Sequence, residues 1–330
     1  MLNFPATNHL LPQHKPSAQP TSSLSVLHSS GGLREKLLHC ARFLVLLFIG
    51  WNGAHGTASA AGVQTPAALQ AKYKELTPRL KNNQFQRPIY LDSAESSNAL
   101  DGNIYAVVDQ PFADAGGALN DAANWCDMLI LHLNTKYCHA SGNAGSTMLQ
   151  VSIGKKLDQP LDEAHQVNFK FSVVASTPDY FHVALNAKEG PMGTRDYKIL
   201  LEAVPLTDGK TFIHLTYSYA YGVTAQMAMK AYLSTVGRNK VGFTRLDNAG
   251  NEERYITGVR GVVERNTMRY YLAIDAYLST LKLPASEQFE KRLQIWFAGT
   301  ERYARQLKEV EREDYLAMKR SEYKRQQSVP

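Results

Sequence analysis

The chain has few cysteines, an ordinary share of charged residues and only one short hydrophobic run near its N-terminus. Three cysteines in 330 residues exclude a small scaffold held together by many disulfides. Charged residues at 20% and aromatic residues at 10% exclude a disordered chain, a collagen and a coiled coil. The net charge is +6, but residues 1–61 contribute four basic residues and one acid, so the remainder carries +3. That excess is too small to favour nucleic-acid binding.

Sequence motifs for common catalytic and metal sites are absent as well. The chain contains no GxSxG nucleophile elbow, no HExxH zinc helix, no phosphate-binding glycine loop and no dinucleotide fingerprint. Its histidines and cysteines do not cluster with metal-ligand spacing, and Cys138 beside His139 stands alone. We therefore expect no metal and no cofactor. Catalysis needs no such motif, because one arginine, one tyrosine and one acid in a cavity can suffice.

Residues 34–61 have the pattern of a secretory signal peptide. Basic residues lead into the apolar run Phe43–Trp51, and Ala58-Ser59-Ala60 provides small residues for cleavage. The run is much shorter than the ~20 residues that span a bilayer, although an uncleaved anchor is the alternative. We expect cleavage near Ala60 and a periplasmic or secreted mature protein. Residues 1–33 are polar and contain several prolines, which predicts disorder or a translation start near Leu33.

Two cysteines stay in the mature chain that this cleavage would produce. Cys126 and Cys138 lie 12 positions apart, and an exported protein meets an oxidising environment. An even pair at short spacing predicts a disulfide in that environment. Two buried free thiols are the alternative.

The mature chain divides into three parts by residue pattern. Residues 62–100 predict a helix followed by a strand, residues 101–250 predict a mainly β domain, and residues 251–330 predict a helical extension. The last 30 residues mix both charge signs, which is typical of a solvated helix. A surface for a partner or a membrane is the alternative for that segment.

Apolar and polar residues alternate through the middle part. Asp101-Gly102 predicts a hairpin turn, and Phe112–Leu131 predicts two short helices with a break between them. His182 and His214 fall on the polar faces of their strands, which predicts surface histidines. Alternation with period two predicts an antiparallel sheet with one wet face. Its strands are expected at 147–153, 166–174, 180–188, 195–204 and 211–221.

The order of these elements is informative. A strand is followed by the segment DQPFADAGGALNDAANW, which includes Trp125, then by consecutive antiparallel strands and a helix at 224–240. Over residues 101–245 this order resembles the START-like (SRPBCC, polyketide cyclase/lipid-transfer) superfamily with its helix-grip fold. The resemblance implies an α+β fold in which a curved antiparallel sheet grips a long helix. The chain adds C-terminal helices, so the gripped helix is either 224–240 or the stretch beginning at Val262.

The resemblance also implies a cavity between the sheet and the helix. Members of the superfamily bind lipids, sterols, polyketides or other apolar molecules there, and a few are cyclases or hydrolases. Independently, Tyr217, Tyr219 and Tyr221 share one face of a strand, and three such rings suit a cavity wall with apolar faces and hydroxyl tips. The alternative is that these tyrosines fill the core.

Two arginines are candidates for contacting a polar or anionic part of a ligand. Arg195 shares a strand face with Tyr197, so it needs an acidic partner or an anionic ligand if it is buried. Arg269 lies on the helix that begins at Val262 and is the second candidate. The alternatives for Arg195 are an exposed position at the strand end or a pair with a structural acid such as Glu189 or Glu264. For Arg269 the alternative is a solvated face or an interhelical salt bridge.

The sequence therefore favours an exported protein that binds or carries a hydrophobic or amphipathic small molecule, which includes lipids. An enzyme that uses the same pocket as a cyclase, isomerase or hydrolase is one alternative. A structural or interaction protein is another, acting through its C-terminal helices and including peripheral contact with a membrane. The pattern makes no prediction of oligomeric state.

Overall fold

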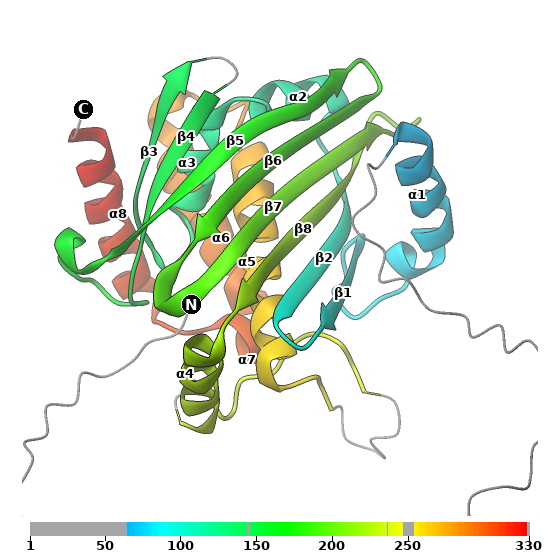
Figure 1. Ribbon diagram of the computed structural model, residues 1–330. Helices are drawn as coiled ribbons and strands as arrows, with labels where there is room; N and C mark the ends of the chain where they lie inside the picture. The colour runs from blue at the N-terminus through cyan, green and yellow to red at the C-terminus, as the bar shows by residue number, and fades with distance from the viewer. Residues whose placement is uncertain (1–64, 144–145, 236, 247–253, 329–330) are drawn as a thin grey trace, which may run out of the picture. The chain divides into compact units, whose positions relative to one another are not determined.

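Eight antiparallel strands form one sheet in the order β1-β2-β8-β7-β6-β5-β4-β3 (Figure 1). Register shifts in the β5–β6 and β7–β8 pairs mark β-bulges, which bend strands and help the sheet to curve. The strands are β1 (Ile89–Glu95), β2 (Ala99–Val108), β3 (Thr135–Asn143), β4 (Ser146–Ile153), β5 (His165–Thr177), β6 (Tyr180–Glu189), β7 (Thr194–Pro205) and β8 (Thr211–Tyr221).

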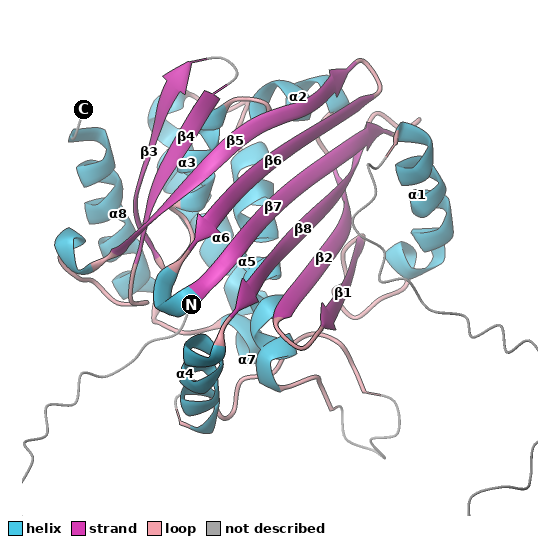
Figure 2. Cartoon of the chain, in the orientation of Figure 1, coloured by secondary structure: helices cyan, strands magenta, loops and turns pink. Residues whose placement is uncertain are grey.

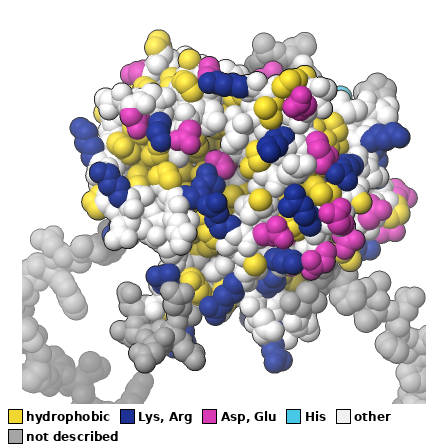
Figure 3. Space-filling view, turned by 180° about the vertical axis from the view of Figure 1, so that it is seen from behind, with side chains coloured by type: hydrophobic (Ala, Val, Ile, Leu, Met, Phe, Trp, Pro, Cys, Tyr) yellow, Lys and Arg dark blue, Asp and Glu magenta, His cyan; other side chains and the backbone are white. Residues whose placement is uncertain are grey.

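Most of the helices lie on one face of the sheet or at its edges (Figure 2). They are α1 (Pro66–Lys81), α2 (Phe112–Leu119), α3 (Ala122–Leu129), α4 (Val223–Ser234), α5 (Gly258–Leu278), α6 (Ala285–Arg302), α7 (Ala304–Leu307) and α8 (Arg312–Ser328). Seen from the helical side, basic and acidic side chains are interspersed with apolar ones (Figure 3). Within the described ranges, no helix combines the length and the apolar character needed to cross a membrane.

The computed structural model does not describe the whole sequence. The predicted signal peptide and the polar segment before it lie outside the described residues, so both stay predictions. The predicted disulfide is present, because Cys126 on α3 is bonded to Cys138 on β3. The described ranges are 65–143, 146–235, 237–246 and 254–328.

The helix that the sheet grips is α5. It packs against β1, β2 and β8 on one side and against α6 on the other, so most of its residues are buried. The predicted fold class is therefore confirmed: a curved antiparallel sheet grips a long helix, with further C-terminal helices. Of the two helices that the sequence left open, the gripped one is the stretch that includes Val262, and α4 lies at one end of the sheet (Figure 1).

Gly102 explains how α5 comes close to the sheet. The predicted hairpin turn at Asp101-Gly102 is wrong, since both residues lie inside β2 and pair with β8. A Cβ at Gly102 would stand 2.3 Å from the hydroxyl oxygen of Thr267 on α5. Thr267 is fully buried and donates to the carbonyl of Val263, so it has little room to move. Glycine is needed here because side chains of α5 pack directly against the strand, not because the chain turns.

The outer face of the sheet is partly covered by α1. Leu69, Leu76 and Leu80 of α1 join a second hydrophobic cluster with residues of β2, β6, β7 and β8. His214, predicted at the surface, is consequently buried. Its ring stacks on Tyr105 and bonds the Glu202 carboxylate at 3.1 Å.

The C-terminal helix α8 packs on β3, a strand that the sequence pattern did not predict (Figure 1). Lys136 of β3 and Lys319 of α8 share the carboxylate of Glu322, at 2.9 and 2.7 Å. All three side chains are fully buried, and each ammonium group also donates to two backbone carbonyls. Burial lowers the pKa of Lys319 to about 8. The expectation of a solvated C-terminal helix is thus wrong for this face of α8.

The close approach at Gly102 can be tested by substitution. Gly102→Ala is expected to lower the free energy of unfolding by about 1–3 kcal/mol, because the new methyl group has to displace Thr267. Gly117 of α2 is the control, since a Cβ there would meet no heavy atom within 4 Å. Gly117→Ala should leave stability unchanged or raise it by up to about 1 kcal/mol. Equal effects in denaturant titrations of the two variants would contradict the packing of α5 on β2.

The buried charges that attach α8 give a second test. Glu322→Gln leaves two buried ammonium groups without a carboxylate and is expected to destabilise the protein by about 3–5 kcal/mol. Arg320→Gln on the same helix is the control, because Arg320 pairs with Glu290 at the surface, and such pairs contribute about 1 kcal/mol or less. Thermal and denaturant unfolding measure the loss of stability in both variants. A loss for Glu322→Gln no larger than the control's would show that α8 is not held by this cluster.

Candidate functional site

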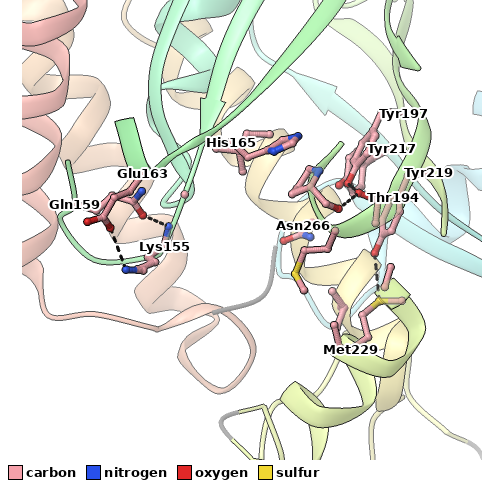
Figure 4. Close-up of a pocket in the computed structure, with 17 residues that line it drawn as sticks. Lys155, Gln159, Glu163, His165, Thr194, Tyr197, Tyr217, Tyr219, Met229 and Asn266 are labelled. Carbon is pink, nitrogen blue, oxygen red and sulfur yellow. Dashed lines mark hydrogen bonds and ion pairs between the residues drawn. The ribbon is translucent and has the colours of Figure 1, made fainter. Parts of the chain in front are cut away.

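A cavity of about 230 Å³ lies between the sheet, α4 and α5 (Figure 4). The strands β7 and β8 supply one wall, and the segment that links β4 to β5 supplies another. The lining includes Tyr197, Tyr217 and Tyr219 from the sheet, Ala225, Ala228 and Met229 from α4, and Val262 and Asn266 from α5. The cavity therefore forms where the sheet, the gripped helix and α4 meet.

Three tyrosine rings form the sheet wall of the cavity. Tyr197 and Tyr219 stack nearly parallel with their ring centres 5.2 Å apart, and Tyr217 lies 5.6 Å from Tyr219. Burial raises the pKa of all three hydroxyls, and neighbouring tyrosines add to this for Tyr217 and Tyr219. The hydroxyls are therefore neutral at physiological pH and serve as hydrogen-bond donors or acceptors.

The three hydroxyl groups differ in how they are used within the protein. Tyr197 donates to the Thr194 hydroxyl at 2.8 Å, and the Tyr219 hydroxyl lies 4.0 Å from the sulfur of Met229. The Tyr217 hydroxyl has no hydrogen-bond partner among the described residues. It is thus the hydroxyl in this wall that a bound molecule can use.

Asn266 of α5 is the main polar group on the helix side of the cavity (Figure 4). Its Oδ1 accepts a hydrogen bond from Nη1 of Arg269 at 3.2 Å, which assigns the orientation of the amide. The Nδ2 group makes no hydrogen bond to any described residue. Asn266 therefore offers two N–H donors to whatever occupies the cavity.

The rim of the cavity is polar on one side. Lys155 pairs with Glu163 at 3.3 Å, and its backbone N–H donates to Gln159 (Figure 4). His165 and the half-exposed Met192 complete this part of the rim. The cavity thus has an apolar, aromatic interior beneath a rim whose ionic groups are paired with each other.

Only some of the predicted site residues line the cavity. Tyr197, Tyr217 and Tyr219 come together as the cavity wall. Tyr221 is buried but lies at the end of β8, beside a different surface groove. Arg269 stands behind Asn266, paired with Glu309 at 2.9 Å.

Arg195 does not contact the cavity. A β-bulge between Arg195 and Lys198 and a positive φ of 55° at Asp196 break the alternation of β7, so Arg195 points outward instead of sharing a face with Tyr197. Its side chain is 44% exposed and lies 3.5 Å from the Asp196 carboxylate. The exposed position at the strand end, left open as an alternative, is the one observed.

Several lining residues were missed by the sequence analysis. Asn266 sits among charged and polar residues of α5, between Arg265 and Thr267, and no local pattern distinguishes it from them. Ala225, Ala228 and Met229 form the inner face of α4, which was predicted as a helix but not as a cavity wall. In the part of the chain that the structure describes, no group of histidine, cysteine or acidic side chains is arranged to hold a metal ion.

Comparison with known proteins finds similarity of structure alone. No family model and no curated sequence matches the chain. The Zhui aromatase/cyclase from Streptomyces sp. R1128 is 11% identical over 60% of this chain and 98% of its own, with a TM-score of 0.35. A conserved protein from Geobacillus kaustophilus is 10% identical over 55% of this chain and 95% of its own, with a TM-score of 0.32.

Human StAR-related lipid transfer protein 5 is 8% identical over 52% of this chain and 94% of its own, with a TM-score of 0.28. Both kinds of protein in the predicted resemblance, a cyclase and a lipid-transfer protein, are thus among the similar structures. The helix-grip fold is assigned from the observed sheet and from the packing of α5 against it.

Proposed function

We propose that the protein binds or carries a small apolar or amphipathic molecule in the cavity between β7, β8, α4 and α5. The observation that carries this proposal is a cavity with a wall of three tyrosines, two of them stacked, and with two free hydrogen-bonding groups, the Tyr217 hydroxyl and the Asn266 amide. Apolar burial of roughly 25 cal/mol per Å² would supply most of the affinity, and the two donors would orient a polar end.

The size and chemistry of the cavity narrow the ligand class. Its volume of about 230 Å³ favours a molecule of two or three rings, or one short chain, over a lipid with two acyl chains. The tyrosines have raised pKa values and therefore do not act as bases near neutral pH. Binding is thus better supported by these residues than proton transfer.

Filling the cavity tests the proposal directly. The neutral fluorescent probe N-phenyl-1-naphthylamine should bind the wild-type protein saturably, and Ala228→Trp should weaken binding about tenfold or more, because the indole occupies the cavity. Met227→Trp is the control, since Met227 on the same helix is 67% exposed and lies outside the lining.

Both variants are first compared with the wild type by circular dichroism and melting temperature, so that a loss of binding is not a loss of fold. No saturable binding in the wild type would overturn the proposal. An equal loss in Ala228→Trp and Met227→Trp would place the bound probe elsewhere.

We also propose that the protein is exported and works in the periplasm or outside the cell. The signal-peptide pattern at 34–61 and the bond between Cys126 and Cys138 support this. Expression in the native host should give a chain that begins near Ala61 and reacts with no thiol reagent until it is reduced. Mass spectrometry of the purified protein checks both. A chain that retains residues 34–61 in the cytoplasmic fraction would contradict export.

A further inference from the structure

Four basic side chains gather behind the inner wall of the cavity. Lys156 follows β4, Lys240 follows α4, and Arg265 and Arg269 lie one turn apart on α5. The four belong to segments that are far apart in the sequence. Glu309, in the segment between α7 and α8, contacts Lys156 at 2.8 Å and Arg269 at 2.9 Å.

Positive charge exceeds negative charge in this cluster. Arg265 is 2% exposed, donates to the Val241 carbonyl at 3.3 Å and forms no ion pair with any described residue. Lys240 donates to the carbonyl of Lys308. The other buried carboxylate nearby, Glu264, accepts hydrogen bonds from neutral groups of residues 93, 243 and 244. Even with Glu264 counted, these four cations stand against two buried anions.

The titration behaviour agrees with this imbalance. Burial, reinforced by repulsion from Arg269 and only partly offset by Glu309, lowers the pKa of Lys156 to about 8. Burial and repulsion from Arg269 also lower the pKa of Arg265. Burial alone would raise the pKa of Glu309, but the attraction of Arg269 and Lys156 lowers it to about 2. Further negative charge in this region would therefore be stabilised.

Three wall segments of the cavity connect directly to the cluster. Lys156 follows the lining residues Gly154 and Lys155 in the chain. On α4, the residue one turn after the lining Met229 is Tyr232, whose hydroxyl accepts a hydrogen bond from Lys156 at 3.3 Å.

On α5, Arg269 donates to the lining Asn266. The Nε group of Arg269 is buried and has no hydrogen-bond partner in the described ranges. Because the side chains of Lys156, Arg265 and Arg269 are buried, their potential reaches the interior of the cavity with weak screening.

We infer that the cavity selects amphipathic carboxylates, with the ligand's carboxylate placed against the Asn266 amide and stabilised by the excess positive charge of Lys156, Lys240, Arg265 and Arg269. This inference rests on the proposed binding function and adds the charge of the ligand to it. A carboxylate fits the two free donors, because its two oxygens can accept from the Asn266 Nδ2 group and from the Tyr217 hydroxyl. The apolar part then lies along the tyrosine wall.

The test compares two ligands that share a chain and differ in charge, octanoate and octanamide, each displacing N-phenyl-1-naphthylamine at neutral pH. The wild type should bind octanoate about tenfold more tightly than octanamide. Arg265→Gln removes a cation that touches neither Glu309 nor the cavity, and it should reduce this ratio roughly threefold or more while leaving octanamide affinity unchanged.

Two further variants make the result decisive. Lys230→Gln removes an exposed cation from α4 and should leave the ratio unchanged, because surface charges are screened. Asn266→Asp, which has nearly the same shape, should abolish the preference for octanoate and provides the answer if Arg265→Gln does not fold.

The outcomes separate the inference from the proposed function. Equal binding of the two ligands by the wild type, or an unchanged ratio in both Arg265→Gln and Asn266→Asp, overturns the charge preference and leaves apolar binding standing. Failure of the probe and both ligands to bind overturns the proposed function as well.

Discussion

The burial of α5 is the constraint on which the rest of the structure depends. The helix is enclosed by the sheet on one side and α6 on the other, yet it carries Glu264, Arg265 and Arg269. Buried charges need partners, and these come from distant segments: the backbone near residue 243 for Glu264, and Glu309 for Arg269. Pairing the buried charges of α5 thus fixes the positions of the loop after α4 and of the segment between α7 and α8.

The same constraint shapes the cavity. The sheet approaches α5 closely at Gly102 but leaves space near the ends of β7 and β8, where α4 closes the opening. Aromatic side chains line the sheet side of that space. The basic cluster, in which Lys156 and Arg269 pair with Glu309, stands behind its helix side. An apolar interior and an excess of positive charge therefore arise together from the way in which α5 is enclosed.

Local pattern predicted the parts of this structure that depend on neighbouring residues. Alternation located most strands and the tyrosine wall, and cysteine spacing predicted the disulfide. Local pattern failed where tertiary contacts override it. It predicts a turn at Gly102, which instead lies in a strand packed against Thr267. It predicts an inward-facing Arg195, whereas a β-bulge at Asp196 directs this side chain to the surface. Asn266 left no sequence signal, because its role depends on Arg269 holding its amide.

The most direct measurement is a crystal structure of the protein with 4-iodobenzoate, whose iodine can be located by anomalous scattering. A cavity enclosed by the sheet, α4 and α5 should hold the iodophenyl ring against Tyr197 and Tyr219, with the carboxylate toward Asn266. Iodine bound only at the surface, with side chains filling the space between β8 and α5, would contradict the existence of the site.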